Sequence, residues 1–350
     1  MYKSKSFYLI AFSLIINSIF SGHSVEYLPD NDIVGNSHVT VIEAQGPDSF
    51  LAGYASGSLK LWDLATRKGK HVILSEKCGN DSGVSSLAAR DGQVIIGRDR
   101  FNIDVFRPES GESSPICTGE CDGFAYSGKR ITAVDLMGEC VVSGDTWGLL
   151  KLWYVNRPTS YEKSFRTLVI SSRQKEYDPS IVQINVDREN VSAVNSDGKI
   201  IQSDIRASKG SVWDTKLKSV NQAVFLSSSY VLLSKSETSN LSLWNLAERK
   251  CVKSMSFGGD KKINTMTLME AGLVMEVRAD NETKLLRLAI KEGALGELKG
   301  DPYPFHGSSE AFVGVGKHLV TTGRGHEGIA GWSSKKTPKP AGINVYTFEN

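Results

Sequence analysis

The stretch Gly323-Arg324-Gly325-His326-Glu327-Gly328 carries the residue types best suited to acid–base chemistry in this sequence. Histidine and glutamate often transfer protons in enzymes, but a general base also needs a partner that holds it in place. The glycines around His326 and Glu327 predict a flexible, solvated loop instead. The sequence also contains no Gly-x-Ser-x-Gly, no phosphate-binding glycine loop with a lysine, and no His-Glu-x-x-His. We therefore predict no catalytic residues.

Cysteines are the next candidates, and the chain has five. An odd number leaves at least one thiol outside any intramolecular disulfide. Cys117 and Cys121 are spaced so that a disulfide between them would close a small loop in an oxidising compartment. A zinc site would need further ligands, and no second cysteine pair or histidine cluster accompanies these two, so we predict no metal and no cofactor. Cys140 and Cys251 lie in strand-like runs and are predicted to be buried.

Exposed aromatic side chains together with arginine and lysine are typical of protein-binding surfaces. A segment of 19 residues, from Gly323 to Ala341, separates two predicted strands. Loops longer than about 12–15 residues are usually functional or disordered. The alternative for Trp147 and Trp332 is packing against their own strands, because tryptophan is mostly buried. The predicted protein-binding residues are Trp147, Tyr303, Phe305, His306, Arg324, Trp332, Lys335 and Lys336.

The elements that must position these residues are β-strands. From His38 to the C-terminus, short apolar or alternating runs are separated by Gly, Asn, Asp and Ser, and there is almost no helical periodicity. In the first unit, strands are predicted at residues 38–44, 49–53, 59–64 and 71–74. Later units follow the same order. The pattern predicts an all-β fold of repeated four-stranded units.

One phrase recurs on the third strand of these units. Leu59-Lys60-Leu61-Trp62-Asp63-Leu64 returns as Leu150-Lys151-Leu152-Trp153-Tyr154-Val155 and as Leu241-Ser242-Leu243-Trp244-Asn245-Leu246. A period of about 40–45 residues, or a multiple of it, predicts stacked units that cannot bury their cores alone. In the other four units the tryptophan is replaced by Phe106, Ser203, Leu288 and Tyr346.

Over residues 38–349 the sequence resembles the WD-repeat (WD40) β-propeller family. Trp62-Asp63 is a full copy of the signature, and His38 lies 24 positions before Trp62, where the family places its histidine. The first unit departs from the family at Ala55-Ser56, where an aspartate is expected. The resemblance implies a seven-bladed propeller. It also implies that the 323–341 loop, Trp147 and the link at residues 303–306 project to the same face as the loops between blades.

The seventh unit requires a strand from elsewhere, because the chain ends two residues after that unit's third predicted strand. Open sheet edges are a liability, and a closed ring of blades needs its last blade completed. The extended segment Val25-Glu26-Tyr27-Leu28 has no other predicted role. We predict that it forms the outer strand of the seventh blade.

The first 24 residues have the features of a secretory signal peptide. Lys3 and Lys5 form a basic head, residues 7–20 are largely apolar, and Gly22-His23-Ser24 ends in small residues. The apolar run is too short to span a bilayer comfortably. Uncleaved signal anchor and buried first strand are the alternatives. We predict a signal peptide at 1–24, one propeller domain at 25–350, and a secreted, periplasmic or lumenal location.

The formal net charge is +2, and two of the positive residues lie in the predicted signal peptide. A nearly neutral chain disfavours nucleic-acid binding, which needs many cations to neutralise phosphates. The leading hypothesis is a non-catalytic scaffold that binds protein partners through one face. The alternatives are an enzyme or quinoprotein-like cofactor binder with its site in the central channel, and a cytoplasmic adaptor whose true start lies near Val25.

Overall fold

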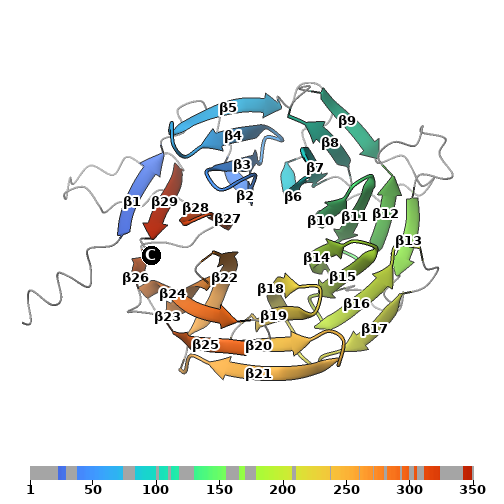
Figure 1. Ribbon diagram of the computed structural model, residues 1–350, viewed down its shortest axis with the longest axis vertical. Coiled ribbons are helices and arrows are strands. Elements are labelled where there is room, and N and C mark those ends of the chain that lie inside the picture. Colours follow the sequence, from blue (N-terminus) through green and yellow to red (C-terminus); the bar gives the residue numbers. More distant parts are fainter. Residues whose placement is uncertain are drawn as a thin grey trace, which may run out of the picture.

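The structure is a computed structural model of the 350-residue chain. It describes residues 23–28, 38–73, 83–99, 102–108, 112–117, 130–154, 165–169, 179–206, 210–236, 238–259, 261–270, 272–279, 282–291, 294–298, 303–305, 311–323 and 342–348. These residues form strands and turns only, arranged as seven antiparallel sheets in a ring around a central channel (Figure 1). No helix among them is long and apolar enough to cross a membrane. The predicted all-β propeller is confirmed.

The blades follow one another in chain order, and the first strand of each lies innermost (Figure 1). Blade 1 contains β2 (Val39–Ala44), β3 (Ser49–Tyr54), β4 (Leu59–Asp63) and β5 (Lys68–Ile73). Blade 2 contains β6 (Val84–Arg90), β7 (Gln93–Arg98), β8 (Ile103–Arg107) and β9 (Glu112–Cys117). Blade 3 contains β10 (Ile131–Met137), β11 (Cys140–Asp145), β12 (Leu150–Tyr154) and β13 (Phe165–Val169). Blade 4 contains β14 (Ile181–Asp187), β15 (Asn190–Asn195), β16 (Lys199–Asp204) and β17 (Ser211–Asp214).

Blades 5 to 7 complete the ring. Blade 5 contains β18 (Val220–Ser227), β19 (Tyr230–Lys235), β20 (Asn240–Asn245) and β21 (Lys250–Ser256). Blade 6 contains β22 (Lys262–Met269), β23 (Gly272–Ala279), β24 (Glu282–Lys291) and β25 (Ala294–Leu298), and β26 (Tyr303–Phe305) adds a fifth strand beside β24. Blade 7 contains β27 (Ala311–Val315), β28 (His318–Gly323), β29 (Gly342–Phe348) and β1 (His23–Leu28).

The first described strand closes the ring, as predicted. β1 pairs antiparallel with β29 from His23 opposite Phe348 to Leu28 opposite Ile343. Leu28 is 3% exposed and packs in the core shared by blades 7 and 1. The strand begins two residues earlier than the predicted domain boundary at Val25, so its first two residues fall inside the predicted signal peptide.

The recurrent phrase occupies equivalent positions on the third strands. Trp62, Phe106, Trp153, Ser203, Trp244, Leu288 and Tyr346 each pair with the second residue of the preceding strand. Trp62 is 4% exposed and stacks on Phe50 with ring centroids 6.2 Å apart. Its indole also covers Gly69 of the outer strand, where a Cβ atom would lie 2.8 Å from the ring. Trp62 is therefore a packing residue of blade 1.

A second layer of equivalent residues forms the core between blades. The residue paired with the fifth position of the second strand is aliphatic and 0–1% exposed in every blade: Leu59, Ile103, Leu150, Ile200, Leu241, Leu285 and Ile343. Removing one such side chain from water contributes about 1.5–3 kcal/mol. Because each blade supplies this residue, the hydrophobic core extends around the whole ring.

Adjacent blades interlock through glycines on the second strands of blades 1 to 3. A Cβ atom on Gly53, Gly97 or Gly144 would lie 2.5–2.6 Å from the first β-branched side chain of the next blade, which is Val84, Ile131 or Ile181 respectively. The first strands of blades 1 to 6 share a register shift beside this residue. The shift is a bulge, and bulges bend a strand and re-aim its side chains.

Two sequence predictions concerning cysteine differ from the structure. Cys251 lies on β21, the outermost strand of blade 5, and is exposed rather than buried. Cys140, at the start of β11, is half-buried. For the proposed Cys117–Cys121 disulfide, Cys117 ends β9, whereas Cys121 lies outside the described residues.

The glycine contacts predict a strong effect at Gly144. Gly144→Ala forces a Cβ atom into the Ile181 side chain, so we expect the free energy of unfolding to fall by about 1–3 kcal/mol. Gly46→Ala is the control, because its nearest neighbour would be 3.4 Å away; we expect a change below about 0.5 kcal/mol. Chemical denaturation measures both. Equal effects of the two substitutions would contradict the interlocking role of Gly144.

Candidate functional site

The turns between second and third strands are held in the same way in the first five blades. The first residue of the turn donates its backbone N–H to the carbonyl of the residue that directly precedes the blade's first strand. The pairs are Ala55–His38, Asp99–Gly83, Thr146–Arg130, Ser196–Ser180 and Ser236–Ser219, with N–O distances of 2.7–3.1 Å. These turns and the connectors between blades therefore lie on one face, which we call the turn face.

Trp147 is the exposed aromatic of the turn face. Its side chain is 43% exposed, although the turn that carries it is rigidly held. The Asp145 carboxylate, which is 2% exposed, accepts hydrogen bonds from the backbone N–H groups of Trp147 at 2.8 Å and Leu149 at 3.0 Å. Gly148 has a φ of 71°, the left-handed conformation that favours glycine. The prediction of an exposed Trp147 agrees with this geometry.

The other predicted binding residues do not gather around Trp147. Tyr303 and Phe305 belong to β26, which pairs with residues 283–285 of β24 at the outer side of blade 6. Blade 6 lies across the ring from β11 and β12, which flank Trp147 (Figure 1). His306, Arg324, Trp332, Lys335 and Lys336 lie outside the described residues. The described members of the predicted set therefore occupy separate parts of the ring.

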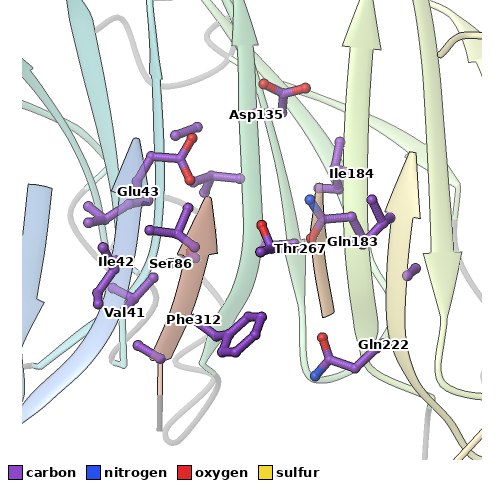
Figure 2. A pocket seen from close by; sticks show the side chains of 18 of the residues that line it. Val41, Ile42, Glu43, Ser86, Asp135, Gln183, Ile184, Gln222, Thr267 and Phe312 are labelled. Carbon is purple, nitrogen blue, oxygen red and sulfur yellow. The ribbon is translucent and has the colours of Figure 1, made fainter. Parts of the chain in front are cut away.

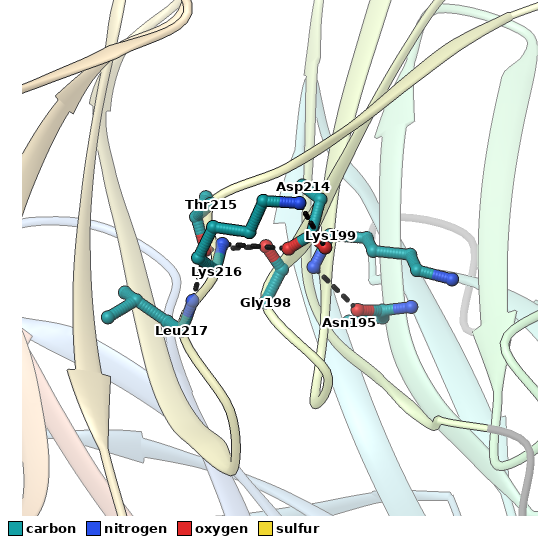
Figure 3. Close-up of polar contacts among 7 residues, drawn as sticks. All are labelled: Asn195, Gly198, Lys199, Asp214, Thr215, Lys216 and Leu217. Atoms are coloured by element: carbon teal, nitrogen blue, oxygen red, sulfur yellow. Dashed lines mark hydrogen bonds and ion pairs between the residues drawn. The ribbon is translucent and has the colours of Figure 1, made fainter.

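A compact polar connector on blade 4 was not predicted (Figure 3). Thr215 donates its hydroxyl to the Gly198 carbonyl at 2.7 Å and accepts the Leu217 N–H at 3.2 Å. Asp214 accepts the Lys216 N–H at 2.7 Å, and this bond is the main cause of the lowered pKa of Asp214. Gly198 has no room for a side chain, because a Cβ atom would lie 2.3 Å from the Leu217 carbonyl oxygen. The connector is therefore fixed against the adjacent turn, beside the exposed Lys216 and Lys218.

The central channel is the second candidate site. Its cavity has a volume of about 570 Å³ and is lined by the first strand of every blade. Figure 2 shows the carboxyl groups of Glu43 and Asp135 toward one end of the channel, with Gln222 and the Phe312 ring toward the other. Among the lining residues, the charged ones are Glu43, Arg90 and Asp135. Within the described part of the chain, no group of three or more His, Cys, Asp or Glu residues is arranged to hold a metal ion.

Glu43, Asp135 and Thr267 hold equivalent positions and make the same inter-blade hydrogen bond. Each is paired with the third residue of its blade's second strand. Asp135 accepts the Val186 N–H of blade 4 at 2.6 Å, and Thr267 accepts the Gly314 N–H of blade 7 at 3.1 Å. The Glu43 carboxyl accepts the Ala89 N–H of blade 2 in the same manner. The bond ties the first strand of one blade to that of the next.

Three further side chains on the inner strands join adjacent blades. Arg90 of blade 2 donates to the Leu136 carbonyl of blade 3 at 3.2 Å and to the Val186 carbonyl of blade 4 at 2.8 Å. At the bulges near the start of their strands, Thr40 donates to the Val84 carbonyl at 2.5 Å and Asn221 donates to the Ile263 carbonyl at 3.0 Å. These three side chains thus satisfy backbone carbonyls of other blades, which would otherwise be costly to bury.

The two carboxyl groups have shifted pKa values. Burial raises the pKa of Glu43 to about 8, with a further contribution from the nearby charge of Asp135, while the Ala89 N–H and Arg90 oppose the rise. Burial also raises the pKa of Asp135, against hydrogen bonds from Val186 and Leu136 and the charge of Arg90. Sequence reasoning missed this pair. The detectable signal was an acidic residue at the same position in two units.

The raised pKa of Glu43 predicts a pH-dependent stability. Folded Glu43 keeps its proton up to about pH 8, whereas the unfolded carboxyl loses it near its ordinary value of 4.5. The stability that protonation contributes is therefore complete below about pH 4.5 and is lost as the pH rises through about 8. We expect Glu43→Gln to flatten the fall in the free energy of unfolding across this window. Denaturation from acid to mildly basic pH measures it, and an unchanged slope would contradict the assignment.

No protein-family model matches the sequence, and no curated protein matches it either. Among solved structures, the fold is similar to the WD40 repeats of RRP9, with a TM-score of 0.68, 13% identity, and coverage of 93% of this chain and 97% of that one. U3-55K gives a TM-score of 0.68 at 14% identity, covering 93% and 98%. The β-propeller domain of Cps50 (Swd1) from Myceliophteria thermophila gives 0.65 at 11% identity, covering 93% and 100%. The chain therefore has the seven-bladed β-propeller fold of WD40-repeat proteins.

Proposed function

We propose that this protein is a non-catalytic scaffold that binds a protein partner through the turn face, with Trp147 as an anchor. The observation that carries the proposal is a tryptophan that is 43% exposed on a turn fixed by a buried aspartate. An exposed aromatic side chain on a rigid backbone loses little conformational freedom when a partner covers it. Tryptophan is also among the residues most enriched at the energetic centres of interfaces.

The surroundings of Trp147 support a polar rim for such an interface. The turn is bonded to the carbonyl of Arg130, whose guanidinium pairs with Asp99 of blade 2 at 2.9 Å. Both side chains are about half exposed, at 49% and 44%. A pair this exposed contributes little to folding, on the order of 0–1 kcal/mol, and its charges remain available to a partner. Polar, solvent-accessible rims of this kind are usual around an apolar centre.

Catalysis in the channel is the main alternative function, and the raised pKa of Glu43 is the observation in its favour. We favour the scaffold because the same groups have structural roles. Asp135 uses both carboxylate oxygens for backbone N–H groups, at 2.8 and 2.6 Å, and Arg90 binds two backbone carbonyls. Perturbed pKa values also arise in structural hydrogen-bond networks, so the shift alone does not indicate a catalytic acid.

We further propose that the scaffold is exported. The support is the basic head and apolar run of residues 1–24, together with the closing strand that follows. Cleavage after Ser24 would leave Val25–Leu28 to pair with β29, including the buried Leu28. A cytoplasmic adaptor would keep its N-terminal residues or begin near Val25 without passing through an export pathway.

Export and ring closure can be tested together. We expect mass spectrometry of the exported protein to find an N-terminus near Val25, and a chain beginning there to unfold cooperatively. A chain beginning at Pro29 loses Leu28 and the β1 hydrogen bonds, so its free energy of unfolding should fall by about 2 kcal/mol or more. Retention of residues 1–24 in the mature protein would contradict the export proposal, whereas equal stability of the two truncated chains would contradict only the closing role of β1.

The scaffold proposal predicts a loss of binding at Trp147. In affinity capture followed by titration of the captured protein, Trp147→Ala should weaken binding at least tenfold, as for an interface hot spot. The variant should stay folded and lose no more than about 1–2 kcal/mol of stability, because the side chain is 43% exposed and only partly packed. Val212→Ala is the matched control, since Val212 is 47% exposed on an outer strand.

Deletion of residues 324–340 tests the long loop in the same assay. If the loop deletion weakens binding and Trp147→Ala binds fully, the interface lies on the loop and not at Trp147. If neither change affects binding while Val212→Ala does, the partner uses the outer strands, and the turn-face proposal is wrong.

A further inference from the structure

The charged side chains of the central channel come from one side of the ring. Glu43, Arg90 and Asp135 come from the first strands of blades 1 to 3. Blades 5 to 7 contribute Val224, Leu268, Phe312 and Val313, and Leu268 is 40% exposed. Gln183, Gln222 and Thr265, from blades 4 to 6, add neutral polar groups. The cavity is thus lined mainly by polar surface, with carboxyl groups on one side and a few apolar side chains such as Leu268 on the other. Placed polar groups of this kind orient a small molecule.

The charged part has one surplus negative charge when both carboxyl groups are ionised, because two carboxylates face one guanidinium. Arg90 is engaged with two backbone carbonyls. Asp135 receives one N–H on each carboxylate oxygen. Glu43 receives the Ala89 N–H. A carboxylate can accept about four hydrogen bonds, so Glu43 retains the most capacity for a further donor.

The size and chemistry of the cavity favour an organic ligand over a metal ion. At about 570 Å³, the cavity falls within the range of about 300–1,000 Å³ that is usual for small-molecule sites. A calcium ion would take about six to eight oxygen ligands, and no three acidic side chains among the described residues are arranged to hold a metal ion. Figure 2 shows the Phe312 ring separated along the channel from the Glu43 carboxyl. A ligand with a cation at one end and an apolar body at the other matches this arrangement.

We infer that the central channel binds a small organic cation, with its ammonium or amidinium group at Glu43 and its apolar body against the Phe312 side of the lining. This site is separate from the turn face. Glu43 lies near the end of β2 that leads into the Gln45–Asp48 turn, opposite to the end of the blade that carries the second-to-third-strand turn. The two proposed sites therefore lie at different places in the fold and are tested by different variants.

Ligand binding should be coupled to the release of a proton. Without ligand, Glu43 is largely protonated at neutral pH, because burial and the nearby Asp135 disfavour its charge and Arg90 only partly offsets them. A bound cation favours the ionised carboxylate. Affinity should therefore rise as the pH increases toward and through about 8. Arg90 and Asp135 are the charged neighbours that share this equilibrium.

Isothermal titration calorimetry of the chain beginning at Val25 tests the inference, with 2-phenylethylammonium as the probe. Ethylammonium lacks the ring, and 2-phenylethanol lacks the charge. We expect the probe to bind at least about tenfold more tightly than either, since both ends of the ligand contribute. Affinity should be higher at about pH 8.5 than at about pH 6.5, with proton release visible as a dependence on buffer ionisation enthalpy.

Glu43→Gln keeps an acceptor for the Ala89 N–H but removes the charge. It should weaken binding of the probe about tenfold or more and abolish the pH dependence. Glu270→Gln removes an exposed carboxylate at the turn after β22 and should leave affinity unchanged. Phe312→Leu should weaken the probe but not ethylammonium. Thermal unfolding checks that each variant is folded.

Three results would overturn the inference. The first is no binding of 2-phenylethylammonium to the wild-type chain at about 10 mM, beyond which an affinity is too weak to be specific. The others are that Glu43→Gln binds this probe as tightly as the wild-type chain does, or that the wild-type chain binds 2-phenylethanol as tightly as the probe. None of them bears on the scaffold proposal, because that proposal is measured by the Trp147 variant.

Discussion

The pairing of β1 with β29 is the contact on which the rest of the molecule depends. This pairing joins the two ends of the described chain through six residue pairs. A propeller blade buries its apolar faces only against its two neighbours, so an open ring would leave the faces of blades 1 and 7 in water. Closure places Leu28 beside Ile42, Phe50 and Ala311 in one core cluster. The channel and the turn face exist because the ring is closed.

Within the closed ring, adjacent blades are fixed by two kinds of contact. The outer contact is apolar: a glycine on one blade receives a β-branched side chain of the next, as Gly144 receives Ile181. The inner contact is polar, and a side chain such as Asp135 or Thr267 accepts a backbone N–H of the next blade. The apolar contact sets how close the blades come, and the polar contact sets their register along the channel axis.

The fold could be predicted because its signals are local. A third-strand phrase with Trp62, Trp153 and Trp244 repeats along the chain, and the structure places all three at one register position. The channel residues could not be predicted in this way. The partner of Asp135 is the N–H of Val186, 51 residues later, and only ring geometry brings them together. Cys251 was wrongly predicted as buried because a strand-like run does not reveal whether its strand is outermost.

The two candidate sites differ in how much a substitution lowers the stability of the fold. On the turn face, the turns are held by backbone groups and by Asp145, as when Thr146 donates to the Arg130 carbonyl, and Trp147 keeps 43% of its surface exposed. An exposed position of this kind can vary with less effect on the fold than a side chain that joins blades. In the channel, the side chains themselves join the blades, and Glu43 is retained although burial disfavours its ionised form and raises its pKa. A glutamine could accept the same N–H, so the inter-blade bond alone does not require the ionisable group of Glu43.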